Sequence, residues 1–332
     1  MRQAMAHAEV GDEQEREDPT VLELERRAAE LLGQEEAVYL PTATMANEIA
    51  LVILSEPRTE LIVEETAHIM TSELGGAARF AGLLARPVRG ERGVFTSEQV
   101  EETFHPGDGF WSAPTSVVAI EDTHNNGGGR IWPHAQLVAV TETARELGLR
   151  LHLDGARLMN AVVGSGVPAA ELGRHFDTVT LCLSKGLGCP LGAIIAGSSE
   201  LMIRARREKH AFGGAMRQAG IVAAAGLHAL DHHVARLADD HARARRLALE
   251  LAERGLPVDP DRVDTNFVQI DVAALGLGED DALARLRDAG VGLSSTRNRG
   301  LLRAVTHLDV TDEDIDRAIE LIPAALGVLA RA

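Results

Sequence analysis

Thr178-Val-Thr-Leu-Cys-Leu183, followed by Ser184-Lys185-Gly186, is the stretch of this 332-residue sequence that decides the fold. The first run is apolar and rich in residues that favour strands, which predicts a buried strand. Lys185 follows it directly, with Gly186 and Gly188 on its far side. An amine held at the end of a buried strand is a candidate for covalent chemistry. The alternative is an exposed loop lysine, and the flanking residues argue against it.

A second strand end lies upstream, where Leu151-His-Leu-Asp154 is followed by Gly155 and Arg157. An acid at one strand end and a lysine at the next suggest a site for pyridoxal phosphate. Asp154 would pair with the pyridine nitrogen, and Lys185 would form a Schiff base with the aldehyde. The alternative for Asp154 is a helix-capping role after the strand.

Around these two strands, apolar runs alternate with helical segments such as Leu137–Leu147. The predicted strands are Ala37–Leu40, Leu61–Val63, Val117–Ile120, Leu149–Leu153, Thr178–Leu183 and Ala193–Ala196. This alternation predicts an α/β fold, with a mostly parallel sheet covered by helices. Open sheets of this kind bind ligands at the carboxyl ends of their strands.

The pattern changes toward the C-terminus. Ile221–Leu256 is predicted as one continuous helix that bridges two domains. Beyond it, the sequence predicts short strands and two helices: strands Asn266–Asp271, Val291–Ser295 and Leu301–Thr306, helix Asp280–Asp288 and a final helix Asp312–Ala330. We therefore expect a large domain over residues 1–238 and a smaller α+β domain over residues 239–332.

Composition excludes several classes of partner. With 33 basic and 50 acidic residues, the net charge of −17 disfavours binding to nucleic acid or to anionic membranes. No apolar stretch approaches the roughly 20 residues of a membrane-spanning helix, and Met1–Asp18 has no signal-peptide core. Cys182 and Cys189 give no disulfide framework, which favours a reducing cytoplasm. We find no metal-type spacing of cysteine and histidine, so no metal is expected.

Small and hydroxyl-bearing residues follow the first predicted strand. Thr42, Ala43 and Thr44 stand where a helix should begin, and free N–H groups there would suit a phosphate. An ordinary threonine cap is the alternative reading. His68 and His124 also follow predicted strands, and each could handle a proton near neutral pH. A buried, structural histidine is the alternative for His68, and a flexible surface turn is the alternative for the segment of His124.

Two arginines stand alone among apolar or small residues. Arg217 lies in Phe212–Gln218 and Arg303 in Leu301–His307. Such arginines bind carboxylate or phosphate groups through paired hydrogen bonds. A structural ion pair is the alternative for both.

Together these motifs resemble one family, the low-specificity L-threonine aldolases, which are pyridoxal-phosphate enzymes of fold type I (aspartate-aminotransferase-like). The matching segments occur in family order over nearly the whole chain: Asp18–Val21, Leu40–Asn47, Glu121–Asn125, His152–Arg157, Leu183–Gly188, Gly213–Gln218 and Val305–Val310. Each segment alone is a weak signal, whereas the set is specific.

The resemblance implies a role for each candidate residue. The implied catalytic residues are Lys185, His68, His124 and Asp154. The implied cofactor-binding residues are Ala43, Thr44, His68, Asp154, Arg157, Ser184, Lys185 and Arg217. In this arrangement His68 stacks on the ring, and Arg217 reaches a phosphate across a subunit boundary. The implied substrate-binding residues are Arg157, Arg303 and His124.

The resemblance also implies an activity, which is cleavage of threonine and related β-hydroxy amino acids to glycine and an aldehyde. It further implies a homodimer or homotetramer with active sites between subunits. A β-eliminating lyase or racemase that uses the same cofactor is an alternative.

The N-terminus departs from the family pattern. Members usually begin with a segment close to Asp-Leu-Arg-Ser-Asp-Thr, whose serine helps to bind the substrate carboxylate, whereas this sequence starts at Met1 within the helix expected to follow. The resemblance then implies either an upstream start or a site without that group. In the second case we expect weaker substrate binding with cofactor attachment preserved, and at the extreme a weakly active pyridoxal-phosphate-binding protein.

Overall fold

A seven-stranded sheet in the order β1-β7-β6-β5-β4-β2-β3 forms the centre of the computed structural model, which describes residues 1–328. Its strands are β1 (Glu36–Leu40), β2 (Glu60–Glu64), β3 (Leu84–Val88), β4 (Thr115–Glu121), β5 (Arg150–Gly155), β6 (Thr178–Cys182) and β7 (Ala193–Gly197). The strands from β6 to β3 are parallel, and β7 runs antiparallel to β1 and β6. The predicted α/β fold with a mostly parallel sheet is confirmed.

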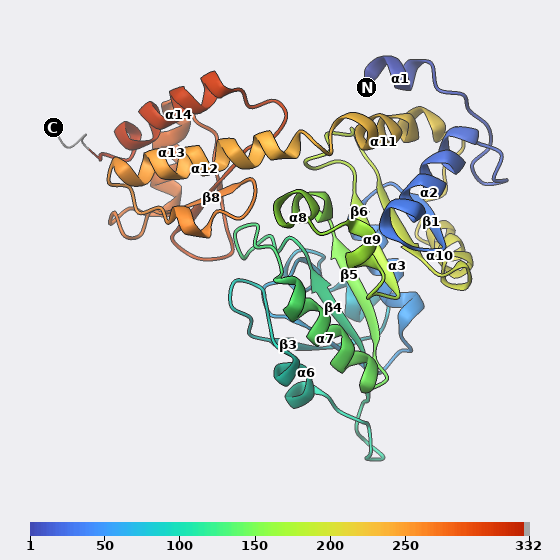
Figure 1. The fold of residues 1–332 in the computed structure, drawn as a ribbon. Coiled ribbons are helices and arrows are strands. Elements are labelled where there is room, and N and C mark those ends of the chain that lie inside the picture. The colour runs from blue at the N-terminus through green and yellow to red at the C-terminus, as the bar shows by residue number, and fades with distance from the viewer. Residues whose placement is uncertain (329–332) are drawn as a thin grey trace.

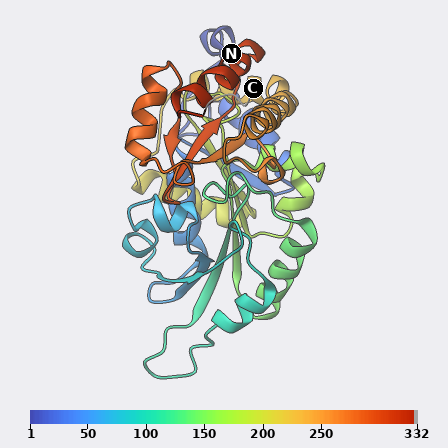
Figure 2. The same ribbon diagram turned by 90° about the vertical axis from the view of Figure 1, so that its left-hand side faces the viewer.

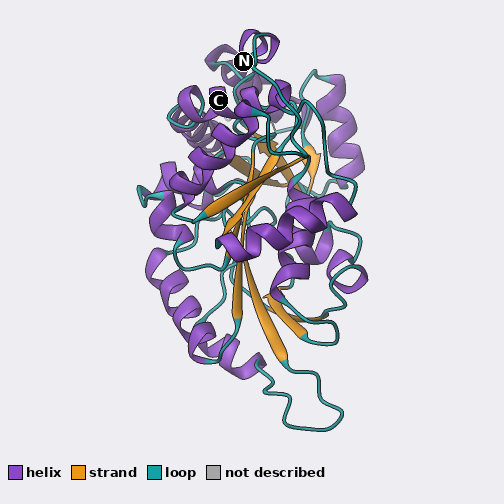
Figure 3. Cartoon of the chain, turned by 90° about the vertical axis from the view of Figure 1, so that its right-hand side faces the viewer, coloured by secondary structure: helices purple, strands orange, loops and turns teal. Residues whose placement is uncertain are grey.

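Helices cover both faces of this sheet (Figures 1 and 3). Side chains alternate along each strand, so that Val38 and Leu40 pack on one face while Ala37 and Tyr39 pack on the other. The first face is covered by α3 (Ala43–Leu54), α4 (His68–Thr71), α5 (Gly76–Arg79) and α10 (Ser199–Ala211). The second is covered by α2 (Pro19–Leu32), α6 (Ser97–Thr103), α7 (His134–Glu146), α8 (Leu158–Ser165), α9 (Ala169–Gly173) and α11 (Gly220–His232), with α1 (Arg2–Ala6) against α11.

The sequence analysis missed β3. This strand lies at the edge of the sheet, most of its residues are partly or fully exposed, and it contains Pro87. An edge strand needs no continuous apolar run and tolerates a proline, so its sequence carries a weak strand signal.

The prediction of one helix over Ile221–Leu256 is wrong. The structure forms α11, which ends at His232, and a separate α12 (Leu237–Glu253). At the break, the N–H groups of Leu237 and Ala238 donate to carbonyls only three residues back. His233 Nδ1 lies 2.7 Å from the Leu187 carbonyl oxygen, so a tertiary contact fixes the break beside the loop that carries Lys185. Helix propensity cannot report such a contact.

A second, three-stranded antiparallel sheet follows α12, in the order β8-β10-β9. It consists of β8 (Phe267–Asp271), β9 (Ser294–Ser295) and β10 (Leu301–Val305), with the 3₁₀ turn η1 (Pro260–Arg262), α13 (Glu279–Asp288) and α14 (Asp312–Ala325) around it. Of these, β8, β10, α13 and α14 share a hydrophobic core with α12. The domain limits of 1–238 and 239–332 stay a prediction. The predicted helix Asp312–Ala330 is too long, because α14 ends at Ala325 and Gly327 takes a left-handed backbone at φ +77°; Ala330 itself lies outside the described residues.

Figure 2 shows the second sheet packed above the first, and a long loop below. This loop precedes β4, and its tip exposes Phe110 and Trp111 almost completely. None of the helices in residues 1–328 is both long and apolar enough to cross a membrane.

Candidate active site

The carboxyl ends of β4, β5 and β6 bring His124, Asp154 and Lys185 to one end of the large sheet. Strand register places Glu121 of β4 opposite Asp154 of β5, and β6 ends three residues before Lys185. The Gly188 N–H donates to the Lys185 carbonyl at 2.9 Å, with Gly188 at φ +71°, so a tight turn follows the half-buried lysine. Ser184 is exposed, and its Oγ lies 3.4 Å from Cys182 Sγ.

Asp154 is buried and held in a fixed orientation. Its Oδ1 accepts from the Ala156 N–H at 3.1 Å, and its Oδ2 accepts from Asn47 Nδ2 at 2.9 Å. Asn47 lies in the first turns of α3, which packs against β5 on one face of the sheet. The carboxylate is therefore fixed by an element that the sequence analysis did not connect with it.

Asn47 is the centre of a buried polar network. Its Nδ2 also donates to Glu73 Oε1 at 3.0 Å, and its Oδ1 lies 3.1 Å from His152 Nε2. Burial lowers the pKa of His152 to about 4, so this ring is neutral. Thr178 Oγ1 lies 2.9 Å from His152 Nδ1. One arrangement uses every group: His152 donates through Nε2, and Asn47 donates to both carboxylates.

His68 lies beside this network. Its Nδ1 is 2.8 Å from Glu73 Oε1, its backbone N–H donates to Glu121, and its side chain is 30% exposed. The hydrogen bond to Glu73 raises the pKa of His68 above its ordinary value. Glu48 is also buried near Glu73. Its own burial and the neighbouring Glu73 carboxyl together raise the pKa of Glu48 to about 8. The Glu73 carboxyl thus orients His68, which remains accessible.

His124 is placed differently. It is fully buried, its Nδ1 accepts from the Gly127 N–H at 3.0 Å, and its Nε2 lies 3.2 Å from Glu64 Oε2. The charges of Glu121 and Glu64 raise its pKa against the opposing effect of burial. Both ring nitrogens therefore face internal groups, and contact of His124 with a substrate stays a prediction.

Arg157 and Arg303 share one aromatic ring. Each guanidinium carbon lies 4.8 Å from the centre of the Phe267 ring in β8. Burial and the charge of Arg303 lower the pKa of Arg157 to about 10. Arg303 Nη1 donates to Asn125 Oδ1 at 2.6 Å. Within residues 1–328, neither arginine forms an ion pair with a carboxylate, so two neighbouring positive charges remain available to an anion.

The start of α3 offers a second anion site. Thr42 caps the helix by accepting the Met45 N–H at 3.2 Å, so the capping interpretation is right for Thr42. The N–H groups of Ala43 and Thr44 keep no acceptor among the described residues, as expected for the first residues of a helix. Arg217 pairs instead with Asp12 at 2.6 Å, and its side chain is 62% exposed. Its proposed role at a phosphate stays a prediction.

Sequence reasoning did not assign three residues of this site: Asn47, Glu73 and Phe267. Asn47 carried a usable signal, because an amide that follows Ala43 by four residues lies one helical turn inside α3. Glu73 and Phe267 gave no local signal, since each acts through a partner distant in sequence.

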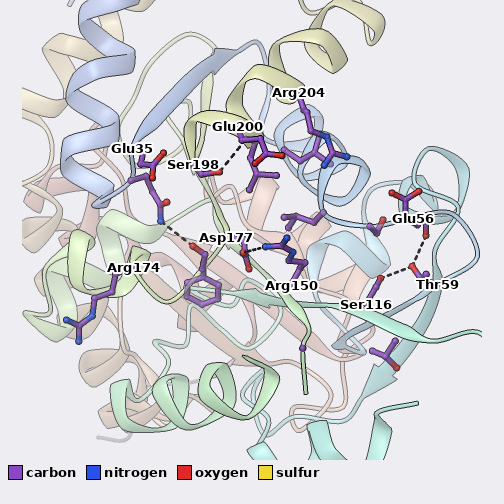
Figure 4. Close-up of a pocket in the computed structure, with 18 of the residues that line it drawn as sticks. Glu35, Glu56, Thr59, Ser116, Arg150, Arg174, Asp177, Ser198, Glu200 and Arg204 are labelled. Atoms are coloured by element: carbon purple, nitrogen blue, oxygen red, sulfur yellow. Dashed lines mark hydrogen bonds and ion pairs between the residues drawn. The ribbon is translucent and has the colours of Figure 1, made fainter. Parts of the chain in front are cut away.

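A cavity of about 730 Å³ lies at the opposite edge of the sheet (Figure 4). Its walls include Arg150, Asp177 and Ser116, which stand near the amino ends of β5, β6 and β4. Arg150 Nη1 donates to Asp177 Oδ1 at 2.9 Å, so these charges satisfy each other. This cavity therefore lies at the other end of the strands from Lys185.

Comparison with known proteins identifies the family. A family model described as beta-eliminating lyase matches residues 1–275. The low specificity L-threonine aldolase of Escherichia coli (strain K12) is 40% identical over 321 residues, covering 95% of this chain and 92% of that protein. The chain belongs to this threonine aldolase/β-eliminating lyase family. The threonine aldolase homologue of Candida albicans is 33% identical, with 95% of this chain and 83% of that protein covered.

Solved structures show the same fold in this threonine aldolase family and beyond it. The Leishmania major threonine aldolase has a TM-score of 0.79 at 20% identity, covering 93% of this chain and 90% of that one. Serine palmitoyltransferase of Sphingomonas wittichii has a TM-score of 0.76 at 17% identity, covering 99% and 83%. The predicted fold type is therefore confirmed, and the chain is a lyase of this family.

Proposed function

We propose that this lyase cleaves L-threonine, L-allo-threonine and related β-hydroxy-α-amino acids to glycine and an aldehyde, with pyridoxal phosphate as cofactor. The observation that carries the proposal is the pair Arg157 and Arg303, two guanidinium groups on one ring without carboxylate partners, at the domain junction near Asp154. Such a pair fits the carboxylate of an amino acid.

The residues present fit the cofactor. The free N–H groups of Ala43 and Thr44 suit its phosphate, the buried Asp154 carboxylate suits a protonated pyridine nitrogen, and Lys185 supplies the amine that binds it. When bound, pyridoxal phosphate accepts the electron pair released from the amino acid Cα. His68, oriented by Glu73, lies beside Asn47 and Asp154, where its ring would stack on the cofactor.

The side chains around the substrate then determine which of its bonds breaks. Arg157 and Arg303 fix the carboxylate and so orient the Cα–Cβ bond of the substrate. His68 takes the proton of the β-hydroxyl, so that this oxygen becomes the aldehyde carbonyl as the Cα–Cβ bond breaks. Proton return to Cα completes glycine.

Product analysis tests the activity. Purified protein supplied with pyridoxal phosphate should release glycine and an equal amount of aldehyde from threonine, allo-threonine and phenylserine. Lys185→Ala should abolish turnover and the visible absorption band of the lysine-bound cofactor. Formation of a 2-oxo acid and ammonia would instead identify the β-eliminating reaction that the family description names.

We further propose a homodimer or homotetramer with active sites between subunits, and a cytoplasmic location. The exposed side chain of Arg217 supports the first, because it is accessible to a neighbouring chain. The unpaired, buried Cys182 and Cys189 support the second. Sedimentation equilibrium of the purified protein tests the assembly.

A further inference from the structure

Three potential metal ligands meet on the second face of the sheet, outside the active site. His134 opens α7, Glu171 belongs to α9, and His175 lies three residues before β6. One ligand atom of each lies within 4.8 Å of the others. His134 Nε2 and Glu171 Oε1 are 3.7 Å apart, and the two imidazole rings are 6.1 Å apart, centre to centre. Neither histidine belongs to the family motifs described above.

One ring nitrogen of each histidine in this cluster lacks a hydrogen-bond partner among the described residues. The Nε2 atoms of His134 and His175 are both hidden from solvent, and neither has a hydrogen-bond partner within residues 1–328. A buried polar atom left without a partner costs about 1–3 kcal/mol. Two such atoms on residues grouped with one carboxylate need an explanation, and one cation bound to all three residues would supply it.

The three ligand atoms lie within 4.8 Å of one another, and one pair is already near the spacing that a small divalent ion needs. Ligands about 2.0–2.2 Å from a tetrahedral Zn²⁺ lie about 3.3–3.6 Å from each other, so a shift of a few tenths of an ångström closes the His134–Glu171 pair. Arg174 contacts Glu171 Oε1 at present. Its side chain is 60% exposed and reaches the rim of the cavity in Figure 4, so it can turn to water at small cost.

We propose that His134, Glu171 and His175 form a binding site for a divalent cation of the zinc class, with a water in the fourth position. The two-histidine, one-carboxylate donor set is one that Zn²⁺ accepts in proteins. The ion would join the start of α7 to α9 and to the segment that enters β6. It would thus link three segments that lie behind the strand that leads to Lys185.

Metal titration of the cofactor-loaded enzyme tests the proposal. After chelator treatment and dialysis, calorimetry with Zn²⁺ should give one site per chain, and Zn²⁺ should raise the melting temperature. His175→Ala and His134→Gln should each weaken this site at least about tenfold and remove the thermal shift. Both side chains are partly exposed, so the variants should fold, which circular dichroism checks. Co²⁺ should give the visible absorption of a tetrahedral site.

The matched control is His228→Ala/His232→Ala. These histidines lie one turn apart on α11, with ring centres 4.5 Å apart, and are the natural competitor for a divalent ion. The control should keep the site. Loss of Zn²⁺ binding in this control, binding unchanged in His134→Gln and His175→Ala, or no zinc bound at micromolar concentration would each overturn the proposal.

Discussion

Asn47 shows how one residue organises a site that contains several charges. Its amide joins two carboxyl groups, Asp154 and Glu73, to the neutral ring of His152. Glu73 in turn orients His68 through a hydrogen bond to its ring, and His68 is the most accessible histidine of the site. Roles assigned to single residues by resemblance thus depend physically on partners to which the resemblance assigned no role.

The Glu73→Gln change should lower the pKa of His68. The hydrogen bond to Glu73 is the main cause of the raised value, and an amide keeps the shape while removing the charge. Because the folded-state pKa is raised, this bond stabilises the fold fully below the unfolded-state pKa, and the stabilisation disappears as pH rises through the folded-state value. Histidine NMR titration measures the shift. Glu65→Gln, at an exposed neighbouring position, should leave it unchanged, and an unshifted His68 in Glu73→Gln would contradict the assignment.

Arg303→Ala should weaken binding of the amino acid substrate. Loss of a charge-assisted contact of about 1.5–3 kcal/mol corresponds to a rise in KM of about 10- to 150-fold. Cofactor absorption should persist, since Arg303 contacts Asn125 and Phe267 rather than the start of α3. Steady-state kinetics with threonine provides the measurement, and Arg285→Ala on the exposed face of α13 is the control. An unchanged KM would remove Arg303 from the substrate site.

At the scale of elements, helix ends in this chain are fixed by capping side chains and by tertiary contacts. Thr42, Thr96 and Thr311 cap their helices in the way that local sequence predicts. The α11–α12 break has no such signal, because His233 and its partner Leu187 come from segments far apart in sequence.

Asp18 holds two helix starts at once, and its loss should be costly. It accepts the Val21 N–H at 3.0 Å in α2 and the Gly220 N–H at 2.8 Å in α11, in a fully buried position. Asp18→Ala should lower the free energy of unfolding by about 2–4 kcal/mol. Thr311→Ala removes a single exposed cap and should cost about 1 kcal/mol. Chemical denaturation compares the two, and equal losses would show that the second contact contributes little.

At the scale of the whole molecule, two separate cores meet at the active site. The large sheet supplies Lys185 and Asp154, whereas the small antiparallel sheet supplies Phe267 and Arg303. Thr265 Oγ1 donates to the Gly129 carbonyl at 2.9 Å, so a buried hydrogen bond also joins the two parts. The arginine pair exists only where these parts meet.

Leu302→Ala should loosen the small core selectively. Leu302 is fully buried in β10, and its truncation should cost about 2–5 kcal/mol. Hydrogen exchange should then accelerate in β8, β10 and α14, while β4, β5 and β6 stay protected. Leu301→Ala, at the half-buried neighbouring position, should have a much smaller effect. Equal acceleration in both sheets would show that the two cores open as one unit.

The sequence by itself determined the α/β class, six strands of the large sheet, the strand-end positions of Lys185 and Asp154 and the family. These depend on local apolar periodicity and on residues that sit next to strand ends. The tertiary structure decided the edge strand β3, the break after α11, the network around Asn47 and the pairing of Arg157 with Arg303. It also brought His134 and His175 together. The sequence could not show these features, because each of them joins residues that lie far apart in the chain.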